Sequence, residues 1–465
     1  MHIEPLNWIE PHQLFEAFAH EPFALFLDSA TAAPGADAAI HGRWSFIALD
    51  PFETLTLTSQ ANDNPFVILA DKLKQYALPA SDSDLPPFTG GAAGFFGYDL
   101  AHHLEKLPPA RAPYARDDQD LPQLTLGFYD TVLAFDMVAR RALLISNGLP
   151  ESDPAARAHR AKIHAVALRK RITEARPANK IPAAPKPRAV TSNFTRPAYE
   201  QAVTRIINYI RAGDIFQANL TQRFEAHLQD DETPYELYLR LRAASPAPFS
   251  AFFNFGTGAL LSSSPERFLM CRNGEVETKP IKGTRPRGAT PQEDKRLASD
   301  LLASTKDRAE NVMIVDLLRN DLSRSCANHT VKVEKLCALE SFANVHHLVS
   351  TVHGELKPAT THLDLLTRAF PGGSITGAPK LRAMEIIAEL EPTTRGPYCG
   401  SIGYLGFDGT MDTSIAIRTM IVKGNRITFQ AGGGIVADSD PVAEYEESLT
   451  KAKSMLQILG GEVQP

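Results

Sequence analysis

The feature that most constrains the fold is a run of strands near the C-terminus joined by tight turns. Apolar and β-branched residues predict strands around Tyr398 to Phe407, Ser414 to Val422 and Arg426 to Gln430. The links Phe407-Asp408-Gly409 and Lys423-Gly424-Asn425 have the residues typical of hairpin turns. Hairpins join antiparallel neighbours, whereas parallel strands need long crossover connections. We therefore expect an α+β fold, in which helices pack outside antiparallel sheets.

A compositional break divides the rest of the chain. Short β-type runs in the first half cover Phe23 to Leu27, Trp44 to Ala48, Thr54 to Thr58, Gly90 to Tyr98 and Thr131 to Phe135. Residues 150–176 are Ala/Arg-rich and predict a helix, and Pro177 to Pro187 predicts an extended connector. Thr195 then caps a helix that ends at Gly213. We expect an N-terminal region over residues 1–149, a connector over 150–192 and a second region over 193–465.

Bulk composition narrows the class of protein. The chain has 465 residues, 43% of them hydrophobic and 22% charged, as in globular proteins with a sizeable core. A net charge of -6 argues against nucleic acid or an anionic membrane as the main partner. The N-terminus predicts no signal peptide, and no apolar run approaches the roughly 20 residues that span a bilayer. Four scattered cysteines fit neither a disulfide framework nor a metal cluster, so we expect a reducing cytoplasm.

Lys282 lies in the basic segment Lys279-Pro280-Ile281-Lys282-Gly283-Thr284-Arg285-Pro286-Arg287. Fixed positive charges nearby would lower the pKa of its amine and make it a nucleophile at neutral pH. The arginines could also clamp a carboxylate-bearing substrate. A solvated basic loop is the alternative interpretation of the same residues.

Two helices predict carboxylates on faces that could meet. Ser304 and Asp307 fit a capping box that opens a helix, and Glu310 falls among its apolar residues. Asp440 can cap the last helix, on which Glu444, Glu447 and Lys451 share a face. Such acidic groups could together hold Mg²⁺, which takes one or two carboxylates plus waters and substrate oxygens. Ion pairs and a solvated helix face remain alternatives.

Backbone and arginine groups suggest an anion pocket. Gly432-Gly433-Gly434 follows a predicted strand and could expose N–H groups to a carboxylate, although a plain turn is an equal alternative. Ser374 to Lys380 opens a helix whose start favours anions. Arg418 is placed on a predicted strand among apolar residues, where a guanidinium suits bidentate carboxylate binding. These residues indicate a pocket for a small polyanion without naming the ligand.

The ordered motifs resemble those of the chorismate-utilising enzymes over roughly Thr195 to Leu456. The matching segments are Gly213-Asp214-Ile215-Phe216-Gln217, Ser264-Pro265-Glu266-Arg267-Phe268, the Lys282 segment, Asp307-Arg308-Ala309-Glu310-Asn311, His347-Leu348-Val349-Ser350, Gly377-Ala378-Pro379-Lys380, Ala416-Ile417-Arg418-Thr419, Gly432 to Asp438 and Glu444-Tyr445-Glu446-Glu447. The resemblance implies an enzyme with two antiparallel β-sheets packed as a sandwich with helices on the outside. It also implies chorismate as substrate and residues 193–465 as the catalytic domain.

Two positions separate the branches of this family. Isochorismate- and salicylate-forming members carry a lysine base where this chain has Gln217, so that branch is disfavoured. Anthranilate-forming members typically read Pro-Ile-Ala-Gly-Thr where this chain has Lys282 in place of the alanine. Lysine at this position resembles the branch that aminates chorismate at C4, towards 4-aminobenzoate and folate. An anthranilate-forming large subunit with an unusual lysine is the nearest alternative, and a non-catalytic ligand-binding subunit is a more distant one.

The resemblance assigns roles to individual residues. Glu310 and Glu447, with Glu444 close by, would hold Mg²⁺, and Glu266 would act as general acid on the C4 hydroxyl. Lys282 would attack C2, and His347 would act near the leaving group as an acid, a base or an orienting group. The remaining substrate-binding residues would be Gln217, Thr284, Tyr398, Arg418, Gly432, Gly434 and Lys451.

The resemblance also implies a partner and a second ligand. None of the four cysteines lies in the strand-to-helix turn of a glutaminase nucleophile, so a separate glutamine amidotransferase subunit would supply ammonia. The first half of such chains can hold tryptophan as an effector or as a structural ligand. Asp28 and Ser29 mark the corresponding neighbourhood here.

Overall fold

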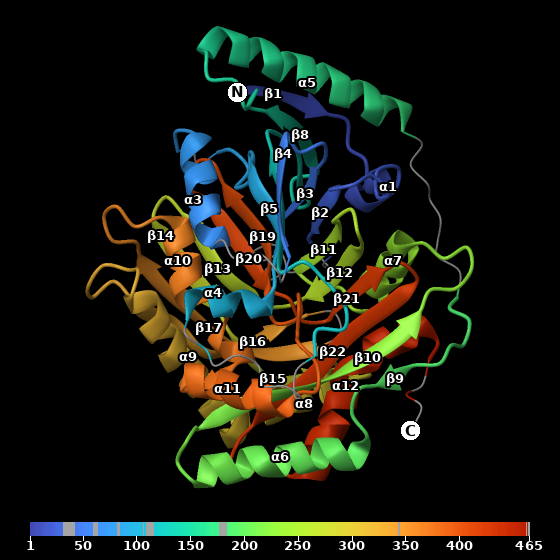
Figure 1. Cartoon of the computed structure of the whole chain (residues 1–465), viewed down its shortest axis with the longest axis vertical. Coiled ribbons are helices and arrows are strands. Elements are labelled where there is room, and N and C mark those ends of the chain that lie inside the picture. Colours follow the sequence, from blue (N-terminus) through green and yellow to red (C-terminus); the bar gives the residue numbers. More distant parts are fainter. Residues whose placement is uncertain are drawn as a thin grey trace.

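The protein is described by a computed structural model that covers residues 1–30, 42–58, 64–80, 84–105, 107, 116–175, 184–342, 345–461 and 463. Within these residues the strands form two sheets (Figure 1). The first sheet runs in the order β1 (His2–Leu6), β8 (Arg141–Ser146), β7 (Thr131–Asp136), β3 (Trp44–Ala48), β2 (Leu25–Asp28), β11 (Phe249–Asn254), β12 (Ala259–Ser264), β21 (Thr419–Lys423), β22 (Arg426–Ile435), β10 (Gln217–His227) and β18 (Gly377–Ala378), and β9 (Thr191–Ser192) pairs with β10.

The second sheet lies against the first. It runs in the order β15 (Ile281–Pro286), β17 (Val345–Glu355), β14 (Glu275–Lys279), β13 (Arg267–Arg272), β20 (Met411–Ile415), β19 (Ser401–Gly406), β5 (Gly91–Phe96), β6 (Leu124–Tyr129) and β4 (Glu53–Leu57), and β16 (Lys332–Ser341) pairs with β17. The pairs are antiparallel in both sheets. Each sheet joins strands from residues 1–149 to strands from residues 193–465, so the two regions predicted from the sequence share their sheets.

An apolar layer between the sheets and helices on their outer faces complete the sandwich. Phe46 and Phe253 of the first sheet pack with Phe95 and Tyr404 of the second in one buried cluster. The helices are α1 (Pro11–Glu16), α3 (Pro65–Gln75), α4 (Ala101–Leu104), α5 (Pro154–Glu174), α6 (Arg196–Arg211), α7 (Pro234–Ala244), α8 (Pro291–Ala303), α9 (Thr305–Ser323), α10 (His362–Ala369), α11 (Lys380–Leu390) and α12 (Pro441–Leu459). In Figure 1 they surround the strands, which confirms the predicted fold class.

Local sequence signals explain where the key helices begin. The Thr195 hydroxyl accepts from the Ala198 amide at the start of α6, as predicted. The Asp440 carboxylate caps α12 in the same way. Ser304 caps α9, but the reciprocal half of the predicted capping box does not form there, because the Asp307 carboxylate pairs with Arg285 instead. These caps fix the two helices that carry Glu310 and Glu447.

Two predicted strands differ from the structure. The chain predicted as one strand over Ser414 to Val422 forms β20 in the second sheet and β21 in the first. Arg418 lies at this crossing with φ 50°, so it is not on a strand as predicted. Conversely, the strand predicted to end at Gln430 continues to Ile435 as β22, and Gly432 to Gly434 pair with β10 instead of forming a turn. An isolated hydrophobic pattern does not reveal which sheet a strand joins.

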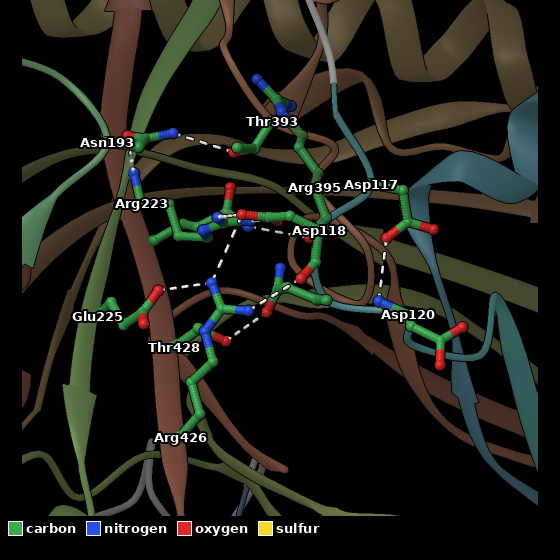
Figure 2. Close-up of polar contacts among 12 residues, drawn as sticks. Asp117, Asp118, Asp120, Asn193, Arg223, Glu225, Thr393, Arg395, Arg426 and Thr428 are labelled. Atoms are coloured by element: carbon green, nitrogen blue, oxygen red, sulfur yellow. Dashed lines mark hydrogen bonds and ion pairs between the residues drawn. The ribbon is translucent and has the colours of Figure 1, made fainter.

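The segment of the N-terminal region that contains Asp118 and Asp120 is bound to the strands β10, β21 and β22 (Figure 2). Asp118 accepts two hydrogen bonds from Arg223 of β10 and lies 3.5 Å from Arg426 of β22. Arg426 also binds Glu225, and Asp120 binds Lys423. The segment therefore links the N-terminal region to strands of the C-terminal region.

The described part of the chain contains no helix with both the length and the apolar character needed to cross a membrane. Residues 176–183 of the predicted connector lie outside the described residues. The predicted helix before the connector is α5, capped by Asp153.

Candidate active site

Lys282 lies on β15 and is held by the main chain of another segment. Its Nζ donates to the carbonyl oxygen of Ser374 at 3.0 Å. Burial lowers the pKa of the Lys282 ammonium, Glu310 raises it and Lys451 lowers it. The predicted direction of the shift is therefore present, but its main cause is burial and the nearby cation is Lys451.

The neighbouring arginines are paired with acidic side chains. Arg285 donates to Asp307 of α9 at 3.0 Å, and Arg287 forms a two-pronged ion pair with Asp294 of α8. Protein carboxylates therefore already pair with both arginines, and the clamp on a substrate carboxylate stays a prediction. Their pairs anchor β15 to two helices and so fix the strand that carries Lys282.

Glu266 directly precedes β13 and is buried beside Lys282. Burial raises the pKa of its carboxyl to about 7, against the opposing effects of the Ser374 hydroxyl, Lys282 and the Ile281 amide. A carboxyl with this pKa still carries a proton near neutral pH. It can therefore serve as a general acid next to the Lys282 amine.

His347 faces Thr284 across the β15–β17 ladder. Its Nδ1 lies 2.9 Å from the Thr284 hydroxyl, while its Nε2 has no hydrogen-bond partner among the described residues. Burial and the charge of Arg418 lower the pKa of the imidazole to about 3, so it is neutral at physiological pH. Because its imidazole is neutral, His347 can orient a ligand or accept a proton, but it does not readily donate one.

Arg418 is half-buried without a carboxylate partner in the described part of the chain. Burial alone lowers its pKa, and its charge acts on His347. A desolvated guanidinium without a counter-ion is a ready carboxylate site. Arg418 therefore lies at the crossing between the sheets and not on a strand as predicted. It is nevertheless beside a predicted site residue, His347.

The acidic groups of α9 and α12 face the same side as Gly433. A Cβ atom on Gly433 would lie 3.2 Å from Glu444 Oε2, 3.4 Å from Glu447 Oε1 and 3.5 Å from Lys451 Nζ. Burial raises the pKa of Glu310, and the charges of Lys282 and Glu447 also act on it. Lys451 binds Glu447 at 2.7 Å, and Ser439 donates to Glu444 at 2.6 Å. A side chain on Gly433 would crowd the ends of these three side chains.

Gln217 begins β10, and its amide is fully buried against Gly434. Neither its Oε1 nor its Nε2 has a hydrogen-bond partner among the described residues. A Cβ atom on Gly434 would lie 1.9 Å from Gln217 Nε2. A buried amide without partners is costly, and it is expected where a ligand completes the hydrogen bonds.

Three predicted residues line cavities whose walls do not include Lys282. Tyr398 lines a small cavity with Arg395 and Gln430, although the Cys399 amide ties this segment to Ala416 near Arg418. Asp28 and Ser29 line a separate cavity of about 290 Å³ between the two sheets. The Asp28 carboxylate there already accepts from Arg242 at 2.6 Å and from Tyr238 at 2.8 Å.

The structure adds contacts that the sequence did not indicate. Ser374 contacts both Glu266 and Lys282, and Asn219 donates to the Ser374 carbonyl at 3.1 Å. Lys306 of α9 lies 3.9 Å from Glu444. Asn219 follows Gln217 at the two-residue strand spacing, which could have signalled its position, whereas the contacts of Ser374 and Lys306 depend on long-range packing.

A family model described as chorismate binding enzyme matches residues 31–457. The chain therefore belongs to the chorismate-binding enzymes, and the resemblance inferred from its motifs is confirmed. It is similar to aminodeoxychorismate synthase component 1 of Escherichia coli (strain K12), with 42% identity over 96% of this chain and 95% of the relative.

Other members of the family are also similar. Anthranilate synthase component 1 of Acetivibrio thermocellus is 38% identical over 97% of this chain and 92% of the relative. The crystal structure of anthranilate synthase component I from Streptococcus pneumoniae TIGR4 superposes with a TM-score of 0.79 at 33% identity, covering 91% of this chain and 93% of that chain. Overall similarity thus establishes the family, and the branch has to be argued from the site.

Proposed function

We propose that this chain is the synthase component of an aminodeoxychorismate synthase, which replaces the C4 hydroxyl of chorismate by an amino group. The observation that carries the proposal is Lys282, whose buried amine is held beside Glu266, a carboxyl whose pKa burial raises to about 7. The similarity to aminodeoxychorismate synthase component 1 of Escherichia coli supports it.

The two groups can perform the first substitution together. Glu266 gives its proton to the C4 oxygen, which leaves as water when the C4–O bond breaks. The lone pair of Lys282 forms a bond to C2, and the two conjugated double bonds of the ring shift as the C4–O bond breaks. Ammonia then forms a bond to C4, both double bonds shift back, and the C2–N bond to Lys282 breaks. The Glu266 carboxylate takes a proton from the new C4 ammonium and so becomes an acid again.

Cationic and neutral donors would hold the substrate during these steps. Arg418 would bind a carboxylate, because it has no counter-ion among the described residues. Gln217 and His347 would complete their hydrogen bonds with the ligand, and Thr284 would orient the imidazole. Tyr398, Gly432, Gly434 and Lys451 would shape the remaining wall.

Mg²⁺ fits the acidic side of this site. Glu310, Glu444 and Glu447 offer the carboxylate oxygens that this ion prefers, and the pKa values of Glu310 and Glu444 are raised by burial with a further contribution from Glu447. No three acidic, histidine or cysteine side chains of the described residues converge as a ready metal cluster. Glu310, Glu444 and Glu447 would therefore hold the ion with waters and substrate oxygens, where it would neutralise a substrate carboxylate.

Ammonia would come from a separate glutamine amidotransferase. All four cysteines are buried, and burial raises the pKa of each thiol, to about 11 for Cys271 and Cys326 and to about 12 for Cys399. A glutaminase needs an accessible thiolate, which none of them provides. The naming of the relatives as component 1 also supports a second component.

The inter-sheet cavity is proposed to hold tryptophan. Asp28 and Ser29 lie on its wall with Trp44, and its volume of about 290 Å³ suits one small apolar ligand. Differential scanning fluorimetry with tryptophan tests this: a rise in Tm that Ser29→Trp abolishes supports the site.

A product assay tests the proposed function. The purified protein is incubated with chorismate, Mg²⁺ and ammonium at alkaline pH, and the products are separated by mass spectrometry. We expect 4-amino-4-deoxychorismate. Fluorescent anthranilate as the sole product would instead support an anthranilate synthase component 1, the alternative suggested by the relatives of that name.

A further inference from the structure

Ser374 touches both reacting groups of the proposed mechanism. It lies in the short turn Gly373–Ile375 and is buried. Its hydroxyl lies close enough to the Glu266 carboxyl to lower the pKa of that group. Its carbonyl accepts from Lys282 Nζ at 3.0 Å and from Asn219 Nδ2 at 3.1 Å. One residue therefore connects the acid to the nucleophile.

The turn that carries Ser374 is fixed through three successive carbonyl groups. After Ser374, the carbonyl of Ile375 accepts from Arg395 Nη1 at 3.0 Å. The carbonyl of Thr376 accepts from the Asn219 amide at 2.8 Å. The Thr376 hydroxyl donates to Gly372 at 3.0 Å, which closes the turn from within. A segment whose polar groups are hydrogen-bonded in this way is held in one arrangement.

A buried ion pair supports the turn from behind. Arg395 is 2% exposed and binds both carboxylate oxygens of Glu391, at 2.7 and 2.9 Å. Glu391 also accepts from the amide and hydroxyl of Thr221 on β10. Because the Arg395 guanidinium and the Glu391 carboxylate bind each other and their neighbours, the ion pair can hold the turn at a fixed position relative to the first sheet.

We propose that Ser374 is a positioning residue that aligns Glu266 with Lys282 and stabilises the carboxylate left after Glu266 transfers its proton. The inference rests on the proposed function. As the proton moves to the departing C4 oxygen, the Ser374 hydroxyl donates to the carboxylate that forms. Its carbonyl meanwhile holds one N–H of Lys282, and the nitrogen lone pair stays free for the bond to C2.

Ser374→Ala removes the hydroxyl and keeps the carbonyl. We expect kcat to fall about tenfold or more, with KM for chorismate near the wild-type value, because the lost bond belongs to the proton-transfer step. The pKa of Glu266 should rise by about one unit, because the bond stabilises its charged form. An infrared titration of the Glu266 carboxyl, assigned with Glu266→Gln, measures that shift independently of turnover.

Matched variants separate positioning from folding. Ser374→Thr retains a hydroxyl and should restore both the Glu266 pKa and kcat. Ser374→Cys keeps the size of the side chain but has a weaker hydrogen-bond donor, so it should give an intermediate shift in the Glu266 pKa. This variant replaces Ser374→Ala in the test if the alanine variant does not fold. Thr376→Val removes the other hydroxyl of the turn and should lower Tm without moving the Glu266 pKa.

An unshifted Glu266 pKa in folded Ser374→Ala, or equal shifts in Ser374→Ala and Thr376→Val, would overturn the inference. Failure of the proposed function is a different result, because it shows in the wild-type enzyme as anthranilate alone. The infrared titration needs no particular product and so decides the role of Ser374 in either case.

Discussion

Buried charges occur in two regions of this protein, and these regions meet at the start of β13. Arg267 lines the inter-sheet cavity, whereas Glu266 lies beside Lys282. In the cavity the charges are matched by protein: Arg267 binds Asp412 at 2.9 Å and also binds Glu277, and Asp28 is bound by Arg242.

Around Lys282 the polar groups are left incomplete. Arg418 has no counter-ion, and Gln217 and His347 Nε2 have no hydrogen-bond partner, among the described residues. Burial raises the pKa of Glu266 to about 7. Unsatisfied buried groups cost stability, and those beside Lys282 and Glu266 lie where a ligand can complete them. The difference predicts that substitutions in the cavity affect stability and those around Lys282 affect catalysis.

The largest expected effect is that of Lys282→Ala on turnover. Loss of the nucleophile should reduce C4 amination by about 10³-fold or more, while Tm should not fall, because a buried cation without an ion pair is removed. Steady-state kinetics and differential scanning fluorimetry measure both. Lys279→Met is the matched control: this nearby lysine pairs with Glu340 at 2.7 Å, so its loss should lower Tm and leave turnover in place. Similar kcat values for Lys282→Ala and Lys279→Met would contradict the role of Lys282 as the nucleophile.

Arg267→Met should give the largest loss of stability in the cavity. It leaves Asp412 and Glu277 without their shared cation, and breaking such a largely buried pair costs about 3 to 5 kcal/mol in the free energy of unfolding. Urea denaturation measures this loss. Arg285→Met, which removes a partly exposed pair with Asp307, should cost about 1 kcal/mol or less. Equal losses in the two variants would show that the cavity charges are not specially paired.

Much of the fold could be predicted because its signals are local. The hairpin turns after Phe407 and Lys423, the caps at Thr195 and Asp440 and the strand Trp44–Ala48 all depend on neighbouring residues. The crossing at Arg418 could not be predicted, because the choice between two sheets is made by long-range pairing. Local patterns carry no information about that choice.

The site was predictable in composition and only partly in arrangement. Motifs identified Glu266, Lys282 and His347, and the structure brings the first two together. The role of Arg285 was missed because a carboxylate from another helix, Asp307, neutralises it. Ser374 was predicted only as the start of an anion-binding helix, and its contacts were missed because they join segments more than 90 residues apart, such as the 92-residue separation from Lys282.

Glu266→Gln tests whether loss of the proton from the buried carboxyl costs stability. The pKa of Glu266 rises from 4.5 to about 7 on folding, so the folded protein binds this proton more tightly than the unfolded chain. The stability from this proton is present below pH 4.5 and is lost as the pH rises to about 7, by about 3 kcal/mol. The glutamine variant should therefore gain relative stability between pH 5 and about 8, measured by urea denaturation. A difference from wild type that stays constant with pH would contradict the raised pKa.

Arg418→Met should separate binding from stability with the smallest effect. Methionine keeps much of the side-chain volume but cannot bind a carboxylate, so KM for chorismate should rise about tenfold to a hundredfold. The free energy of unfolding should stay the same or rise, because an unpaired buried charge is removed. Arg242→Met is the counterpart in the cavity, where Asp28 would lose its cation: there Tm should fall and KM should stay near wild type. A fall in Tm for Arg418→Met without a change in KM would mean that its guanidinium stabilises the crossing between the sheets and does not bind the substrate.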